Sequence, residues 1–312
     1  MNLSPRNAAK LHKLRQFSRL IRESAFHSIT GEPKQYVTAP FGELGVTFIG
    51  HSSFLIQIGG RNVLIDPVFS NRLVLLRRFR HPGLLIADLP PIDLVLLTHA
   101  HMDHLDRASL RKIVRQQQRM YQRSPVAVVP VRVDDLVNDL GFRSVETTET
   151  WHTLRHSGIE ITRTPSRHWG ARMFNDTDRG FGGYVLRAGA QSLYHSGDTA
   201  YFSGFREIGL RLSPDIALLP IGAYHPDNFR TVHTSPEDAL QAFQDLGSRT
   251  MIPMHFGTFR LSYEPMHEPE ERLREAATRA GLAARVQVLG EGETTFFQPA
   301  IKRRAGLQVH AG

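Results

Sequence analysis

Three histidines and one aspartate fall within six residues of this chain, at His99, His101, Asp103 and His104. They directly follow an apolar run, residues 92–97, that predicts a buried strand. Side chains two residues apart in an extended loop lean the same way, so His99 and His101 can reach one metal ion. Asp103 and His104 can face a second point close by. Imidazole and carboxylate groups are common ligands of zinc and related divalent ions, which favours a metal site over three solvated histidines.

Ligand-type residues recur at the ends of three other predicted strands. His168 follows the strand at 159–164, Asp198 follows the strand at 192–195, and His255 follows the strand at 251–254. Loops at strand ends are where protein scaffolds place binding and catalytic groups. The repetition indicates one site assembled from distant parts of the chain.

Hydrophobic periodicity and turn signals predict one domain of mixed strands and helices. Ser235 and Pro236 are typical of an N-cap and a first helical position. Further strands are predicted at 46–49, 54–58, 63–65, 126–131, 184–186, 216–220 and 286–289, and helices at 107–117, 134–140, 205–212 and 269–280.

Composition limits the chemistry. The 312 residues include no cysteine, so disulfides and thiolate ligands are excluded, and any metal must be held by His, Asp or Glu. The formal charge of +8 favours anionic partners. No run approaches the roughly 20 apolar residues of a spanning helix, and no secretory signal is apparent. We therefore expect a cytoplasmic protein, soluble or attached to the inner face of the membrane; homo-oligomers are left open.

The first 35 residues predict a basic, helical extension, followed by the main domain at 36–300 and a tail at 301–312. Within the extension, Leu14, Phe17 and Ile21 share one helical face. A basic amphipathic helix at residues 5–25 could contact an anionic membrane. Packing against the domain is the favoured alternative.

Three features near the predicted site each have two interpretations. Asp66, at the end of the strand 63–65, either orients a ligand histidine or caps a turn. His51 either lies near the site or is structural, the latter being favoured. The segment 72–85 mixes leucines with arginines. It could hold an acyl chain of a substrate or contact a membrane. The slightly favoured alternative is a helical segment that docks on the core.

The His-x-His-x-Asp-His stretch, followed by His168, Asp198 and His255, resembles the metallo-β-lactamase superfamily. Within it, the segments at 49–56, 65–70, 219–224 and 255–259 resemble the branch of N-acyl-phosphatidylethanolamine-hydrolysing phospholipase D and its bacterial metal-dependent hydrolase relatives. Met102 and Phe256 depart from the aromatic residue and the tryptophan common in that branch.

The resemblance implies an α+β fold, an αβ/βα sandwich of two mixed β-sheets packed face to face with helices outside. It implies two divalent metal ions, zinc being expected and manganese or iron being alternatives. One metal would be held by His99, His101 and His168, the other by Asp103, His104 and His255, with Asp198 bridging them.

The ligand set predicts hydrolysis by a metal-bridging hydroxide. Asp103 would guide the proton of the hydroxide. His233, which the resemblance places near the metals, would stabilise the transition state or protonate the leaving group, a structural role being equally weighted. The favoured activity is a phospholipase D-like phosphodiesterase on an anionic or lipid-like ester, and the alternative is a lactonase or amide hydrolase. A nuclease is disfavoured because aromatic residues do not alternate with the basic ones; a non-catalytic scaffold is disfavoured because it needs no ligand set.

Overall fold

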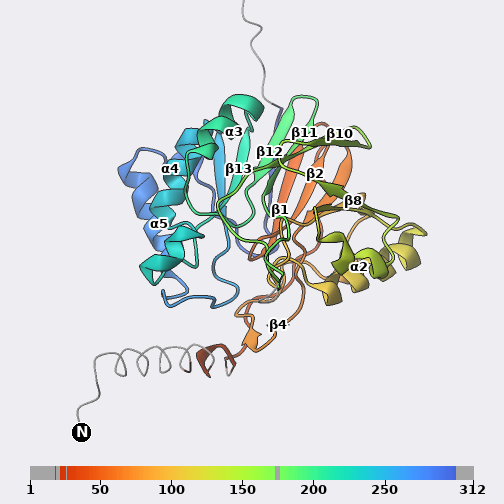
Figure 1. Ribbon diagram of the computed structural model, residues 1–312, viewed down its shortest axis with the longest axis horizontal. Coiled ribbons are helices and arrows are strands. Elements are labelled where there is room, and N and C mark those ends of the chain that lie inside the picture. The colour runs from red at the N-terminus through yellow and green to blue at the C-terminus, as the bar shows by residue number, and fades with distance from the viewer. Residues whose placement is uncertain (1–17, 19–21, 26, 173–175, 300–312) are drawn as a thin grey trace, which may run out of the picture.

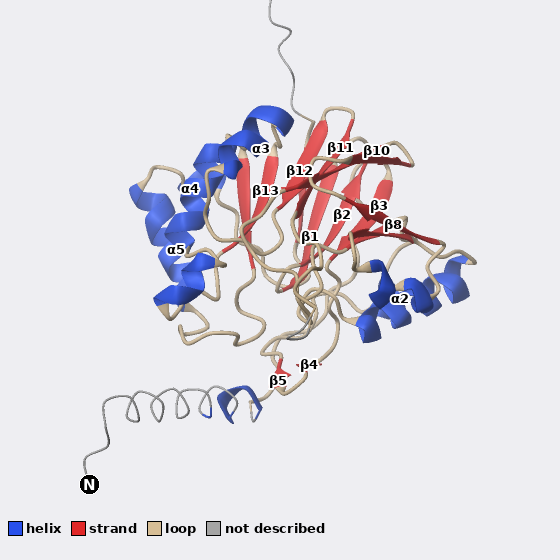
Figure 2. Cartoon of the chain, viewed as in Figure 1, coloured by secondary structure: helices blue, strands red, loops and turns tan. Residues whose placement is uncertain are grey.

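Two mixed β-sheets lie face to face, with helices on their outer surfaces (Figures 1 and 2). The computed structural model describes residue 18 and residues 22–25, 27–172 and 176–299. The predicted architecture, an αβ/βα sandwich, is therefore confirmed. The tail at 301–312 and most of the N-terminal extension lie outside the described residues, although residues 22–25 are helical.

Within the described chain, the first sheet has seven strands and the second has six. In spatial order the first contains β15 (Thr294–Phe297), β1 (Leu44–Gly50), β2 (Ser53–Ile58), β3 (Arg61–Ile65), β6 (Leu94–Leu96), β7 (Val126–Pro130) and β8 (Ser144–Thr148). The second contains β14 (Thr250–Met254), β13 (Ile216–Pro220), β12 (Gln191–His195), β11 (Gly183–Ala188), β10 (Ile159–Thr164) and β9 (Thr153–His156).

The helices cover the two sheets from opposite sides. Helix α2 (Arg107–Tyr121) packs on the first sheet, and α3 (Gly204–Leu212), α4 (Pro236–Leu246) and α5 (Glu268–Arg279) pack on the second (Figure 1). Short 3-10 turns occur at Ile86–Asp88, Asp134–Leu136, Asn138–Leu140, Asp227–Thr231 and Ala283–Arg285. None of the helices in the described part of the chain is long and apolar enough to cross a bilayer.

Three apolar layers follow from this stacking. One lies between the sheets and contains Phe54, Ile56 and Leu218, and the other two lie between each sheet and its helices. Strands β1 and β2 are buried along their whole lengths because both faces meet an apolar layer. This explains why their sequences are nearly continuous in apolar residues rather than alternating.

Helix α4 begins where its sequence indicates. The Ser235 side chain accepts a hydrogen bond from the Asp238 amide, the Asp238 side chain accepts one from the Ser235 amide, and Pro236 occupies the first turn. Gly247 ends the helix in the left-handed conformation, at φ +67°. The helix is therefore determined locally at both ends.

Three local predictions are corrected by the structure. Residues 286–289 form no strand; Val286 makes an isolated bridge to Met251, and the last described strand is β15, which pairs with β1. The predicted helix at 134–140 is two 3-10 turns. The segment 72–85 docks no helix, because Arg72–Leu73 (β4) and Leu76–Arg77 (β5) pair as a small antiparallel hairpin. Strands β8 and β9 were not predicted, since their alternation of polar and apolar residues is weak.

The layer between the sheets gives a direct test of the fold. Phe54 is fully buried, with its ring 5.1 Å from that of Phe48 and 5.8 Å from that of His195. We expect Phe54→Ala to lower the free energy of unfolding by about 3–5 kcal/mol in denaturant titrations, because it leaves a cavity. Phe41→Ala is the control, because the Phe41 side chain is fully exposed. A change in its free energy of unfolding above about 0.5 kcal/mol would contradict the assignment of the core.

Candidate metal centre

All the predicted ligands lie at one edge of the two sheets. Strands β3, β6, β7 and β8 run parallel in the first sheet, and β12, β13 and β14 run parallel in the second. The carboxyl ends of β6, β10, β12 and β14 are followed by His99–His104, His168, Asp198 and His255 respectively. Residues separated by up to about 150 positions therefore meet because parallel strands end at the same side.

The His99–His104 loop is held at both ends. The amides of His104 and Leu105 donate to the carbonyl of His101, and Asp106 then caps α2 by accepting from the Ala108 amide. A guanidinium nitrogen of Arg172 donates to the carbonyls of Ala100 and Leu105, at 2.8 and 2.9 Å. Arg172 thus fastens the loop from across the site; no pattern in the sequence indicated this role.

The first cluster of donor atoms comes from His99, His101, His168 and Asp198, and these atoms all lie within 4.8 Å of one another. Nε2 of His99 and Nε2 of His168 lie 2.9 and 3.2 Å from Nδ1 of His101. Both Nε2 atoms are 3.9 Å from Oδ2 of Asp198. These are the residues assigned to one metal by the family resemblance, together with the bridging aspartate.

The second cluster comes from His51, Asp103, His104 and His255, again within 4.8 Å. Asp198 reaches this cluster too, since its carboxylate oxygens lie 3.2 Å from Nε2 of His104 and 3.0 Å from Nε2 of His255. Asp198 therefore lies between the two clusters, as a bridging ligand must. His51, which the sequence favoured as structural, contributes its Nε2 at 3.0 Å from Oδ2 of Asp103.

His233 lies at the rim of the same site. Its Nδ1 is 3.8 Å from Oδ2 of Asp198, and its ring contacts those of His168 and His255. His168 is oriented by the loop that carries His233, because its Nδ1 lies 2.8 Å from the carbonyl of Val232. The 222–233 loop thus both positions a ligand and brings His233 to the centre.

These residues fit a pair of bound cations. Nε2 of His104, Nε2 of His255 and Oδ1 of Asp198 are buried and have no hydrogen-bond partner within the described structure. Buried polar atoms are costly unless they are satisfied, and divalent cations would satisfy all three. The His and Asp clusters are thus consistent with a binuclear metal site.

The protonation of the metal-free site follows from its mixed charges. Burial alone would raise the pKa of Asp198, but His104 and His255 outweigh it and hold this pKa well below its usual range. Burial likewise disfavours a charged His255, yet Asp198 and Asp103 raise its pKa to about 9. Burial lowers the pKa of His168 to about 4 and that of His233 to about 3. Without metal, protons on some imidazoles balance the buried carboxylates.

Asp66 orients a ligand from behind. Its Oδ1 accepts from the Thr98 amide at 2.8 Å, and its Oδ2 accepts from the Thr98 hydroxyl at 2.6 Å and lies 2.7 Å from Nδ1 of His104. All of these groups are buried. The carboxylate therefore contacts the ring nitrogen of His104 opposite the Nε2 that faces Asp198, which is the arrangement expected if Asp66 orients a metal ligand.

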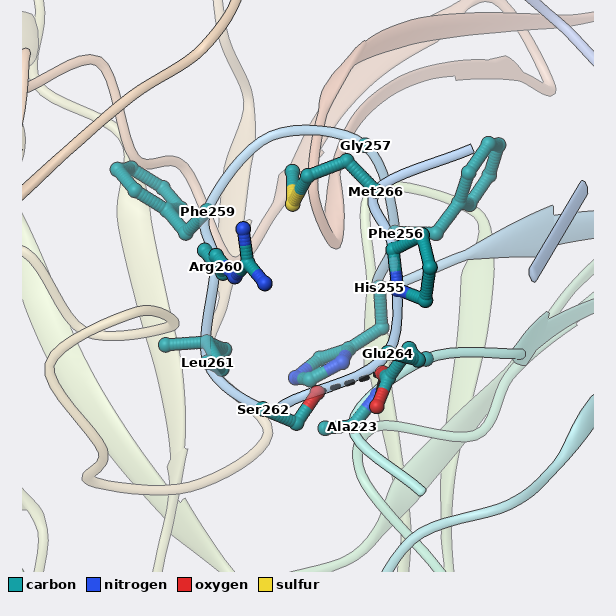
Figure 3. Close-up of a pocket in the computed structure, with 12 residues that line it drawn as sticks. Ala223, His255, Phe256, Gly257, Phe259, Arg260, Leu261, Ser262, Glu264 and Met266 are labelled. Atoms are coloured by element: carbon teal, nitrogen blue, oxygen red, sulfur yellow. Dashed lines mark hydrogen bonds between the residues drawn. The ribbon is translucent and has the colours of Figure 1, made fainter. Parts of the chain in front are cut away.

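Glu264 joins the two loops that border the site on the side of the second sheet. Its carboxylate accepts from the amides of Ala223 and His225, at 2.7 and 3.1 Å, and from the Ser262 hydroxyl at 2.5 Å. Figure 3 shows the chain after His255 curving round to Met266, with Ser262 and Glu264 hydrogen-bonded beside the cavity that this curve encloses. Nothing in the sequence distinguished Glu264 from a surface acid.

Comparison with known proteins agrees with this geometry. Residues 61–256 match the model of the β-lactamase superfamily domain. An uncharacterized protein of Mycobacterium tuberculosis is 33% identical over 80% of this chain and 68% of its own length. A metal-dependent hydrolase of Methanopyrus kandleri is 30% identical over 80% of this chain and 98% of its own length.

The N-acyl-phosphatidylethanolamine-hydrolyzing phospholipase D of Saccharomyces cerevisiae is 31% identical over 80% of this chain and 55% of its own. Among solved structures, the metallo hydrolase Igni18 of Ignicoccus hospitalis superposes with a TM-score of 0.63 at 25% identity, covering 82% of this chain and 99% of the other. The fold and the site define a metal-dependent hydrolase. The chain belongs to the metallo-β-lactamase superfamily.

The contact between Asp66 and His104 predicts a metal-affinity effect. In Asp66→Asn an amide NH₂ group replaces the carboxylate oxygen that now lies beside Nδ1 of His104. An NH₂ group cannot accept a hydrogen bond from that nitrogen, so His104 loses its orienting partner. We expect metal affinity to fall by about 10–100-fold, measured by competition with a chelator. Asp93→Asn, at the opposite end of β6, is the matched control; equal affinities in both variants would contradict the role of Asp66.

The raised pKa of His255 predicts proton release on metal loading. Its proton, present in the metal-free protein at pH 7, must leave before the imidazole can bind a cation, and the same holds for His104, whose pKa is well above its usual value despite burial because of Asp198 and Asp103. Metal affinity should therefore rise with pH up to about 9. Calorimetric titration with metal in buffers of different ionisation enthalpy measures the number of protons released. Binding heats that do not depend on the buffer would refute the proton release.

Proposed function

We propose that this hydrolase is a phosphodiesterase acting on an anionic, lipid-like ester, in the manner of a phospholipase D. One observation carries the proposal: Asp103 belongs both to the second donor cluster and to the wall of an apolar cavity of about 420 Å³. The other lining residues are Leu73, Val74, Leu75, Leu76, Met102, Phe229, Leu261, Ser262 and Tyr263.

The shape of this site suits a substrate with two unlike parts. Ten residues line the cavity, and Asp103 is the one charged side chain among them, so it would accept an acyl chain with little desolvation cost. Asp103 joins the cavity to the second donor cluster, where bound cations would neutralise an anionic phosphodiester. The name of the yeast relative, which is 31% identical, supports this substrate class.

Bound divalent ions, zinc being the expected pair, would supply an activated water and offset the charge that develops on the substrate oxygens. The residues of the chain do the rest. Asp103, which contacts His51 and lines the cavity, would take the proton of the attacking water. His233, at the rim, is neutral at pH 7 because burial lowers its pKa to about 3, so it would stabilise the transition state by donating a ring N–H to a substrate oxygen. The apolar wall would exclude bulk water from the reacting ester.

Turnover of defined esters tests the proposal. With the metal-loaded protein, kcat/KM for phosphodiesters should rise with acyl length by up to about fourfold per methylene until the cavity is filled, since each buried CH₂ contributes about 0.8 kcal/mol. Asp198→Ala or removal of metal should abolish turnover, because Asp198 reaches both clusters.

A matched panel separates the rival activity. Bis-p-nitrophenyl phosphate and long-chain phosphodiesters are compared with acyl lactones of the same chain lengths. Faster hydrolysis of the lactones would replace the phosphodiesterase by a lactonase using the same cavity. Full activity of Asp198→Ala would refute the mechanism for either substrate.

A further inference from the structure

The β4–β5 hairpin carries an exposed apolar tip. Val74 and Leu75 are 71% and 59% exposed, whereas their neighbour Leu73 is buried against Val68 and Phe259. Figure 2 shows the hairpin at the lower edge of the molecule, away from α3 at the top. The hairpin is therefore anchored at its base and presents two large apolar side chains to the surroundings.

The turn itself is unfavourable for the residue it holds. Val74 has a φ of +54°, in the left-handed region where a β-branched side chain is strained and where glycine or asparagine would serve a tight turn better. Its exposed side chain gains little from packing. What Val74 adds, at that conformational cost, is apolar surface at the tip.

The surroundings of the tip are basic. The segment 69–85 contains four arginines and no acidic residue; Arg78 is fully buried and Arg80 pairs with Glu291, which leaves Arg72 and Arg77 beside the tip. Arg72 is exposed, and Arg77 donates to the carbonyl of His27. An anionic surface could approach this edge without meeting a carboxylate on the hairpin.

The hairpin also lies where the basic N-terminal segment joins the domain. The ring of His27 stacks on Phe79 at 3.7 Å, Thr30 bridges to Arg80, and Glu23 pairs with Arg260. Ahead of Glu23 the sequence has six lysines and arginines and no acid. The described residues 22–30 therefore lie beside the hairpin and its neighbouring loop.

The tip is continuous with the apolar cavity. Val74 and Leu75 line it together with Leu261 and Phe229, and so does Asp103 of the second donor cluster. A surface that covered the tip would thus lie against a wall of the same cavity that Asp103 borders.

We propose that the β4–β5 hairpin docks this protein on an anionic lipid bilayer, with Val74 and Leu75 inserted among the acyl chains and Arg72 at the headgroups. An exposed apolar tip beside the exposed Arg72 fits a bilayer interface, where burial of apolar side chains and attraction to anionic headgroups both favour binding. A nucleic acid would match the arginines but not the exposed Val74 and Leu75. Docking goes beyond the proposed activity and does not depend on which ester is cleaved.

Vesicle binding of the full chain tests the docking. The protein should sediment with vesicles of phosphatidylcholine and phosphatidylglycerol, and more weakly with phosphatidylcholine alone or in high salt. Val74→Ser/Leu75→Ser should weaken the binding by about tenfold or more, because both side chains lose their burial in the bilayer. Leu210→Ser on α3, which is 80% exposed, is the matched apolar control and should bind as the parent does.

A charge variant gives an independent second reading. Arg72→Glu should reduce binding to the anionic vesicles and spare the residual binding to phosphatidylcholine, whereas Arg206→Glu on α3 should change neither. Thermal melting of each variant checks that it is folded. Since Val74 and Arg72 are exposed, we expect little change in the melting temperature.

Several results would overturn the docking proposal. One is the absence of vesicle binding by the parent protein, and another is equal binding by the parent and the tip variant. Loss of self-association in the tip variant, seen by sedimentation velocity without lipid, would make the tip a contact between copies. Vesicle binding without turnover of any phosphodiester would leave the docking intact and refute the proposed activity instead.

Discussion

The buried carboxylate of Asp198 is the constraint on which the rest of the structure depends. It lies within 3.0–3.9 Å of nitrogen atoms of His99, His104, His168, His233 and His255. A buried carboxylate is tolerated only when positive charge compensates it, either from protonated imidazoles or from bound cations. Gathering so many ionisable groups at one point is therefore stable only if each ring is held in one orientation.

That orientation is supplied from outside the clusters. Asp66 fixes His104, the carbonyl of Val232 fixes His168, and Arg172 fastens the loop between the histidines. Glu264 ties together the two loops that flank the second sheet. The sheets bring the strand ends to one edge, and these polar contacts convert that proximity into a defined geometry.

The metal centre sets the type of reaction, whereas the surrounding loops set what reaches it. An isothiocyanate hydrolase shares the fold with a TM-score of 0.66 at 21% identity, and a diiron β-hydroxylase shares it with 0.60 at 18%. The sandwich thus accommodates unrelated chemistry. In this chain an apolar cavity borders Asp103, and residues 73–76 of the β4–β5 hairpin form part of its wall.

The ligand types and their order along the chain were determined by the sequence alone. His99, His101, Asp103 and His104 are neighbours in one loop, and each remaining ligand follows an apolar run that predicts a strand. Helix α4 was likewise predictable, because Ser235, Pro236 and Gly247 act on their own segment. Such features depend on local chemistry, which a sequence displays directly.

What only the tertiary structure decided is which distant groups meet. His51 joins the second cluster, and Glu264 and Arg172 bind backbone groups up to 72 residues away, through contacts that have no signature in the sequence. The hairpin at Arg72–Arg77 was open to a helical interpretation because a short apolar run has no decisive period. Strand β15 pairs with β1 from the opposite end of the chain. These contacts arise from the way the two sheets stack, and short-range sequence patterns do not indicate how the sheets stack.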